Sequence, residues 1–134
     1  MNELFGELML RFHHLGEEMP PFDELGITPA QFYYINFIAE NSPCSLKQVT
    51  EGLGFSPASV SLMLKHLENK GLISKNSNPL DKRSFDLELT AEGSQLFQKV
   101  DRYRKQKAAM ALSRLSTVEQ EQFLMLFEKI LKNS

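Results

Sequence analysis

Cysteine and long apolar runs are scarce in this 134-residue sequence. The single cysteine, Cys44, excludes an internal disulfide framework and fits a reducing compartment. No apolar run approaches the roughly 20 residues of a transmembrane helix, and Glu3 and Glu7 interrupt the N-terminal apolar residues, unlike a cleavable signal. We therefore expect a cytoplasmic protein without a membrane segment, whose 42% hydrophobic residues suffice for the core of about one domain.

The sequence also lacks the motifs that would indicate an enzyme or a metal centre. It has no glycine-rich phosphate loop, no nucleophile motif, and no histidine and cysteine set at metal-ligand spacing. His13 and His14 are adjacent, so on a helix their side chains diverge by about 100° and cannot chelate one metal as a local pair. His66 and Cys44 are isolated in sequence. We expect no enzymatic activity, no metal and no cofactor.

What the sequence does contain is a series of clear helix boundaries. Thr28 followed by proline predicts a cap and a helix over residues 28–40. Ser45 and Gln48 form a capping box, and a short helix should follow until Gly52 or Gly54. Ser56 followed by proline then predicts a third helix, with apolar residues at helical spacing until a glycine at position 71. Two short helices joined by a tight glycine-containing turn predict a helix-turn-helix.

A β-hairpin is predicted directly after these helices. The chain enters a strand after the glycine stop, passes through a polar loop that holds Asp81, Lys82 and Arg83, and returns in the alternating strand 85–89. A basic hairpin tip beside an exposed helix suits DNA, because phosphates attract cations and a narrow minor groove accepts an arginine side chain.

The terminal segments predict helices with large apolar faces. These are a first helix around residues 2–16, a long helix from Thr90 to about Leu115, and a last helix that a Ser116 to Glu119 capping box opens. A small winged-helix unit could not bury so much apolar surface unaided, so we expect an intertwined homodimer. The alternative is that both terminal helices fold back on their own domain.

The charge is unevenly distributed along the chain. The net charge of −2 argues at first against nucleic acid, but residues 1–44 hold one basic and seven acidic side chains. Residues 56–85 hold five basic side chains against two acidic ones, a net of +3. The two interpretations are a basic DNA-binding face and a solvated surface with chance clustering.

Taken in order, the motifs resemble the MarR family of transcriptional regulators. They are TPAQF at 28–32, LKQVTEGL at 46–53, LENKGLI at 67–73, DKR at 81–83, LTAEG at 89–93 and LSTVE at 115–119. The resemblance implies a mainly α fold with a small β-hairpin wing, in which a winged helix-turn-helix at 28–92 is flanked by dimerisation helices at 1–20 and 93–134. It implies one domain over 1–134 that binds double-stranded DNA at a pseudo-palindromic operator as a homodimer. Such a protein is usually a repressor that a small ligand or oxidation releases.

The resemblance also assigns residues to the DNA-binding surface. In the recognition helix and the wing these are Ser56, Ala58, Ser59, Ser61, Lys65, Lys75, Lys82 and Arg83. Arg83 matches the wing arginine that enters the minor groove, and Asp81 matches the residue that orients the wing. Short hydroxyls contact either phosphates or bases, so they specify no sequence. Many relatives carry arginine where this chain has Leu62, so either another residue makes that contact or the operator differs.

An effector site and the cysteine complete the sequence-based expectations. The aromatic residues Phe12, Phe32, Tyr33 and Tyr34 lie where family members bind effectors, which suggests a small aromatic effector, although helical spacing favours core packing for most of them. Cys44 precedes a helix cap that could lower its pKa, but the peroxide sensors of the family carry their cysteine in the first helix, so we favour a buried, inert thiol. The functional alternative is a winged-helix protein-interaction module without DNA binding.

Overall fold

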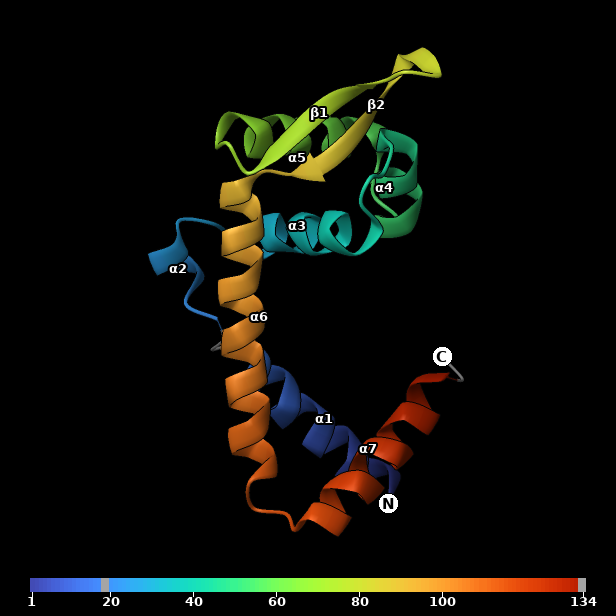
Figure 1. The fold of residues 1–134 in the computed structure, drawn as a ribbon. Coiled ribbons are helices and arrows are strands. Elements are labelled where there is room, and N and C mark those ends of the chain that lie inside the picture. Colours follow the sequence, from blue (N-terminus) through green and yellow to red (C-terminus); the bar gives the residue numbers. More distant parts are fainter. Residues whose placement is uncertain (18–19, 133–134) are drawn as a thin grey trace. The chain divides into compact units, whose positions relative to one another are not determined.

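The computed structural model describes residues 1–17 and 20–132, and for residues 13–17 and 82–84 it describes the main chain alone. The chain forms two compact units, Met1–Asp101 and Arg102–Ser134, which we describe in turn. The mainly α fold with a two-stranded hairpin confirms the predicted class (Figure 1). Its elements are α1 (Asn2–Glu17), α2 (Phe22–Leu25), α3 (Pro29–Asn41), α4 (Leu46–Leu53), α5 (Pro57–Asn69), β1 (Ile73–Asn78), β2 (Asp81–Leu89), α6 (Ala91–Leu112) and α7 (Thr117–Lys132).

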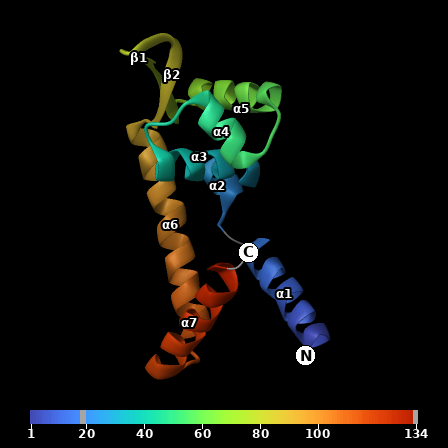
Figure 2. The same cartoon turned by 90° about the vertical axis from the view of Figure 1, so that its right-hand side faces the viewer.

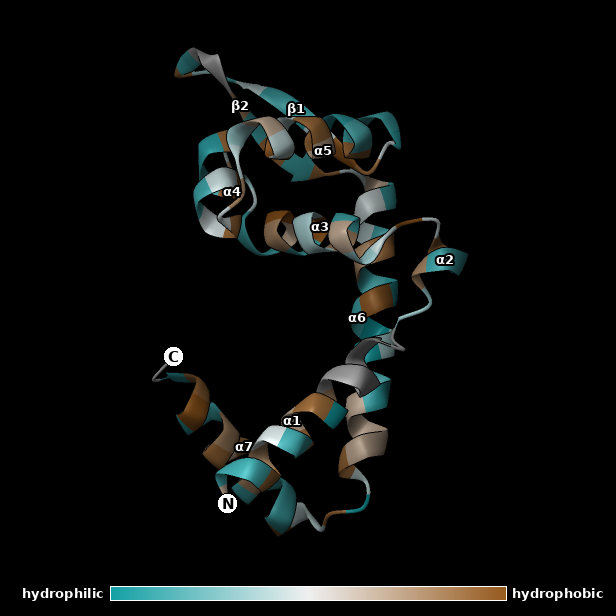
Figure 3. Ribbon diagram, turned by 180° about the vertical axis from the view of Figure 1, so that it is seen from behind, coloured by the Kyte–Doolittle hydropathy of each residue, from teal (hydrophilic) through white to brown (hydrophobic). Residues whose placement is uncertain are grey.

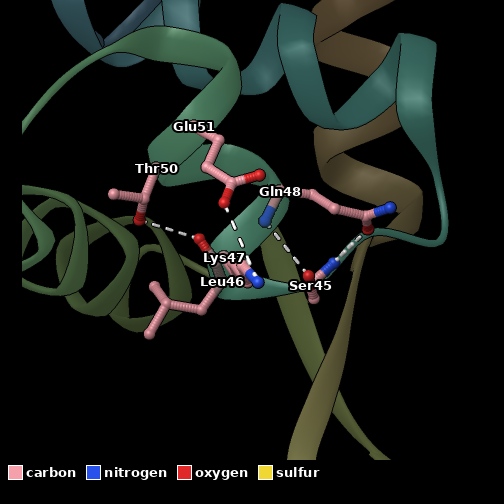
Figure 4. A network of polar contacts seen from close by, with 6 residues as sticks. All are labelled: Ser45, Leu46, Lys47, Gln48, Thr50 and Glu51. Atoms are coloured by element: carbon pink, nitrogen blue, oxygen red, sulfur yellow. Dashed lines mark hydrogen bonds and ion pairs between the residues drawn. The ribbon is translucent and has the colours of Figure 1, made fainter.

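The predicted caps fix the starts of α3, α4 and α5. Thr28 forms a capping box with Gln31, and Ser45 forms one with Gln48. Figure 4 shows the second box: Ser45 Oγ accepts from the Gln48 amide at 3.1 Å, and Gln48 Oε1 accepts from the Ser45 amide at 2.8 Å. Gly54, with φ of 73°, is the C-cap of α4, because this left-handed conformation suits glycine. The helix-turn-helix of α4 and α5 is therefore confirmed.

The core of the first unit lies where α3, α4 and α5 pack against one another and against the hairpin (Figure 1, and the rotated view in Figure 2). From α5, Val60, Leu64 and Leu67 are buried at helical spacing, which places one face of this helix in the core. The other elements contribute further residues that are at most 5% exposed: Ile27, Phe32, Tyr34, Ile35, Ile38, Cys44, Val49, Ile73, Leu87 and Val100.

The hairpin is antiparallel, and its register runs from the Ile73–Leu89 pair to the Ser77–Phe85 pair, then shifts so that Asn78 pairs with Asp81. Prediction and structure differ at the tip: Asp81, Lys82 and Arg83 belong to the main chain of β2, whereas the sequence placed them in a loop. The reason is that Asn78 pairs with Asp81 across a two-residue turn, and the shift in register between Ser77 and Asn78 accommodates the extra β2 residues before Phe85 as an irregularity of the ladder.

Cys44 extends the base of the hairpin. The Leu87 amide donates to the Cys44 carbonyl at 2.7 Å, and the Cys44 amide donates to the Leu87 carbonyl at 3.2 Å. These two hydrogen bonds fix the start of the α4 segment to β2. The base of the hairpin is therefore tied to the helix-turn-helix.

Thr90 links the hairpin to α6. Its amide donates to the Leu72 carbonyl at 3.1 Å, its hydroxyl donates to the Gly71 carbonyl at 2.6 Å, and its Oγ1 accepts from the Gly93 amide at 3.1 Å. Gly93 lies so close to the Leu72 carbonyl that an added methyl group would overlap the oxygen. The LTAEG motif therefore makes a tight junction that needs threonine and glycine.

The second unit contains the end of α6 and α7. A capping box between Ser116 and Glu119 opens α7, as predicted, and the hydrogen bonds from the Ser116 backbone and hydroxyl lower the pKa of the Glu119 carboxyl. Gln120 Nε2 donates to the carbonyls of Leu112 and Leu115, at 2.9 and 3.1 Å, and so fixes the turn between the helices. The long helix ends at Leu112, three residues before the predicted end.

Large apolar side chains are exposed on both terminal helices. The hydropathy-coloured ribbon carries hydrophobic segments on α1 and on α7 (Figure 3). No residue of α7 is buried within the chain. The exposed apolar residues of α7 are Val118, Phe123, Leu124, Met125, Leu126, Ile130 and Leu131, and those at the start of the chain and in α1 are Met1, Leu4, Phe5, Leu8, Met9, Leu10 and Phe12.

Candidate nucleic-acid interface

The face of α5 opposite the core carries most of the residues that the sequence assigned to DNA. All of the assigned residues from this helix and its cap are exposed, namely Ser56, Ala58, Ser59, Ser61 and Lys65. Val60, Leu64 and Leu67 hold the other face of α5 in the core. The packing of the helix therefore determines that the exposed residues point to solvent. An α-helix with one exposed face of short side chains fits the width of the DNA major groove.

Two hydroxyl groups lie together at the N-terminus of α5. Ser56 Oγ accepts from the Ser59 amide at 3.2 Å and lies 2.9 Å from Ser59 Oγ. Pro57 has no amide hydrogen, and the amides of Ser59 and Val60 are bonded to Ser56, so few backbone donors remain at this end. The helix dipole and the exposed serine hydroxyls are therefore what would favour a phosphate oxygen here.

Leu62 lies in the middle of the exposed face of α5. Its side chain is 60% exposed, and it follows Ala58 by four residues and precedes Lys65 by three, so the three share one stripe of the helix. Lys65 and His66 are exposed in the next turn. Leu62, where the family resemblance leads us to expect an arginine, is thus a surface residue with no role in the core.

Two lysines of the basic segment make contacts within the protein. Lys75 Nζ lies 3.6 Å from the Glu68 carboxylate, so the ion pair joins β1 to α5. Lys70 Nζ donates to the Gly26 carbonyl at 2.8 Å and to Gln31 Oε1 at 3.1 Å, which ties the end of α5 to the start of α3. The net positive charge of residues 56–85 therefore overstates the number of cationic side chains that are free to contact phosphates.

The turn of the hairpin is exposed. Leu80 is 95% exposed, and its amide donates to Asn78 Oδ1 at 2.9 Å, which stabilises the turn. Asp81 is exposed and pairs with Asn78 in the ladder. The side chains of Lys82 and Arg83 lie outside the described residues, although their main chain places them at the start of β2.

The four predicted effector residues have different environments. Phe32 is buried and its ring lies 6.2 Å from that of Phe97, and Tyr34 is buried with its ring 5.9 Å from that of Phe55. Burial raises the pKa of the Tyr34 hydroxyl. Tyr33 and Phe12 are exposed by 52% and 60%. Core packing thus accounts for Phe32 and Tyr34.

A hollow of about 480 Å³, not predicted from the sequence, lies beside the end of α5. No local sequence pattern indicates this hollow, because three segments far apart in the sequence form it. Its walls contain two lysines and two glutamates among apolar and small residues: Glu24, Leu25, Gly26, Ile27, Lys70, Leu72, Glu92, Gln95, Leu96 and Lys99.

Cys44 has the environment of an inert thiol. The residue is 1% exposed, and burial, with a smaller contribution from the charge of Asp86, raises the pKa of its thiol. A raised pKa lowers the fraction of reactive thiolate at neutral pH, which is the opposite of a peroxide sensor. This supports the interpretation of a buried structural cysteine.

Two features are absent from the described part of the chain. Residues 1–17 and 20–132 contain no group of three or more histidine, cysteine, aspartate or glutamate residues arranged to hold a metal ion. Within the same residues, no helix has both the length and the apolar character to span a bilayer.

The sequence and structure were compared with known proteins. The sequence model of the MarR family matches residues 25–84. The HTH-type transcriptional repressor MdtR of Bacillus subtilis is 30% identical over 123 residues, which cover 88% of this chain and 79% of that protein. The transcriptional regulator HosA of Escherichia coli O111:H- is 28% identical over 131 residues, which cover 98% of this chain and 91% of that protein.

Solved structures show the same fold. The YusO protein of Bacillus subtilis is 28% identical with a TM-score of 0.75, and the match covers 99% of this chain and 98% of that one. A mutant of MepR from S. aureus has a TM-score of 0.81 at 21% identity, with 98% of this chain and 96% of that chain covered. At that identity the likeness concerns the fold alone.

Proposed function

Because the chain belongs to the MarR family of transcriptional regulators, we propose that it is a homodimeric repressor that binds a pseudo-palindromic operator and is released by a signal. The observation that carries the proposal is the exposed face of α5, whose short hydroxyl and cationic side chains stand opposite three buried residues. Similarity to the repressor MdtR, at 30% identity, supports repression over activation.

The exposed apolar helices support the homodimer. α7 has apolar side chains around much of its circumference, and a helix of this kind is normally buried. Contiguous apolar patches are rarely exposed on monomeric proteins and mark protein interfaces. A second copy of the chain supplies an identical apolar surface, and two-fold symmetry makes such a surface self-complementary.

A small aromatic molecule is the proposed releasing signal. Tyr33 is half exposed and its ring lies 6.3 Å from that of Phe55, which is 45% exposed. An exposed aromatic pair can stack with a flat ligand, and the phenol hydroxyl can donate a hydrogen bond. Phe55 lies between α4 and α5, so a ligand there would act next to the DNA-binding helix.

Gel shift and footprinting test the proposal with the DNA upstream of the coding region of this chain. We expect protection of two half-sites about one turn apart, roughly 10 base pairs, because a two-fold dimer presents two copies of α5. Affinity should fall steeply as salt increases, with a log-log slope set by the phosphates neutralised. A single protected half-site would contradict the dimeric arrangement.

The competing function is a protein-interaction module, in which the exposed Leu62 on α5 would be a contact residue. An absence of retained DNA at physiological salt, across the whole upstream region, would support this function. Retention of a mapped operator, together with competition by unlabelled operator and no competition by a scrambled duplex, would exclude it.

Arg83→Ala tests the contribution of the hairpin to operator binding. The planar guanidinium is suited to the enhanced negative potential of a narrow minor groove. We expect a loss of about 1–3 kcal/mol in binding free energy, as for one good specific contact, with thermal stability and oligomeric state unchanged. Fluorescence anisotropy on the mapped operator measures the loss.

Arg114→Ala is the matched control for that experiment. Arg114 is an exposed arginine between α6 and α7, so its replacement removes the same charge at a position far from the hairpin in sequence. The control should bind the operator as the parent does. If Arg83→Ala binds the operator as tightly as the parent at physiological salt, Arg83 does not contribute to operator binding, and the proposed role of the hairpin is wrong.

A further inference from the structure

Leu62 is an exposed leucine at the centre of the helix that is proposed to enter the major groove. Its side chain is 60% exposed, whereas Val60, Leu64 and Leu67 of the same helix are buried. Resting on the proposed DNA-binding function, we propose that Leu62 contacts the C5-methyl group of a thymine and makes this base a requirement of each operator half-site.

The neighbours of Leu62 allow a close approach to the base edges. Ala58 lies one turn before it and Ser61 directly precedes it, and both side chains are short and exposed. Lys65 and His66 occupy the turn that follows, where longer side chains can donate to phosphates. Leu62 therefore lies between short side chains on one side and hydrogen-bond donors, Lys65 and His66, on the other.

The chemistry of the major groove identifies the group that Leu62 would contact. Adenine, guanine and cytosine present hydrogen-bond donors and acceptors there, and thymine adds the apolar methyl group. A leucine placed against N7, O6 or N4 would remove water from a polar group without replacing its hydrogen bond, which is unfavourable. Placed against the methyl group, it buries apolar surface on both sides.

The polar surroundings of Leu62 favour DNA over a protein partner. Its exposed neighbours on the helix are Ala58, Ser59, Ser61, Lys65 and His66, of which Ala58 alone is apolar. Protein interfaces have an apolar core that is depleted of charge. DNA offers a matching surface, because the methyl group of a thymine can contact the leucine while the flanking phosphates accept hydrogen bonds from the hydroxyl and cationic groups.

Uracil substitution tests the proposal because deoxyuridine differs from thymidine only by the missing methyl group. Each thymine of the footprinted half-sites is replaced singly, and anisotropy gives the affinity of the parent protein. We expect one thymine of each half-site whose replacement weakens binding about fourfold, the value for one buried methyl-sized group, and about 15-fold when both half-sites are changed.

Variants of Leu62 assign the effect to this side chain. With Leu62→Ala the thymine and uracil operators should bind equally, and with Leu62→Met, which keeps an apolar side chain of similar volume, the penalty should return. Leu80→Ala, at an exposed leucine of the hairpin turn, is the control and should keep the full penalty. All three replacements are at exposed positions, so the fold should be retained.

Two results would overturn the inference while leaving the proposed function intact. One is a parent protein that binds the operator with the expected salt dependence but shows no penalty at any thymine. The other is a penalty of unchanged size in Leu62→Ala. Failure of the parent to bind any upstream duplex would instead overturn the proposed function, and this inference with it.

Discussion

Ile130→Asp is expected to convert the proposed homodimer into monomers of 15.3 kDa. Ile130 is 53% exposed on the apolar face of α7, next to the turn where Phe123 and Phe127 stack with ring centroids 5.7 Å apart. A carboxylate buried there without a partner loses several kcal/mol of solvation. The dissociation constant should therefore rise by about a thousandfold, which corresponds to about 4 kcal/mol.

Light scattering at micromolar concentration measures the effect, with helical circular dichroism as the check that the chain remains folded. Gln122→Asp is the matched control, because it adds the same charge at an exposed polar residue of α7 and should leave the proposed dimer intact. A parent protein that runs at the mass of one chain would remove the dimer from the proposal. So would an Ile130→Asp variant that associates as tightly as the parent.

Gly93→Ala is expected to cause the largest loss of folding stability among conservative replacements at the hairpin junction. The added methyl group would overlap the Leu72 carbonyl, and that carbonyl also accepts the Thr90 amide, so it cannot move without disturbing the junction. Overpacking of this kind costs about 3 kcal/mol. Thermal denaturation should show a midpoint lower by roughly 10 °C.

Gly6→Ala is the control for the glycine experiment. Gly6 lies in α1, and an added Cβ there meets no atom within 4 Å. Alanine is the better helix former by about 1 kcal/mol, so the control should keep or raise the midpoint. A Gly93→Ala protein with the stability of the parent would show that α6 can shift away from β1 at little cost.

The helix boundaries were predictable because their determinants are local. Thr28, Ser45 and Ser116 each bond an amide three residues ahead, and in each case the residue at that position bonds back. A sequence pattern of four residues contains both partners of such a box. The same locality explains why α2, a helix of four residues without a side-chain cap, was not predicted.

The tertiary contacts were not predictable for the opposite reason. Lys70 was counted as one cation of a basic segment, yet its partners are Gly26 and Gln31, 44 and 39 residues away. The Cys44–Leu87 bridge spans 43 residues, and the open hollow beside α5 draws its walls from three segments. Sequence periodicity assigns a residue to a face, but it does not identify the residue on the other side.

The proposed binding face has some features that the sequence predicts and others that depend on tertiary contacts. The exposure of Ser56, Ala58 and Lys65 followed from the spacing of the buried residues of α5. The ion pair of Lys75 with Glu68 joins a strand to a helix, and it depends on how the two elements pack. Leu62 was recognised in the sequence as a departure from relatives, but its place at the centre of the exposed face required the structure.

The hairpin is anchored at one end and exposed at the other. Cys44 and Thr90 bond its base to neighbouring segments, while the turn at Leu80 faces solvent. Exposed loop tips tolerate substitution and insertion better than buried, hydrogen-bonded backbone does. Over evolutionary time, descendants of this chain can therefore lengthen or change the turn, while the anchored base keeps the inherited fold unchanged.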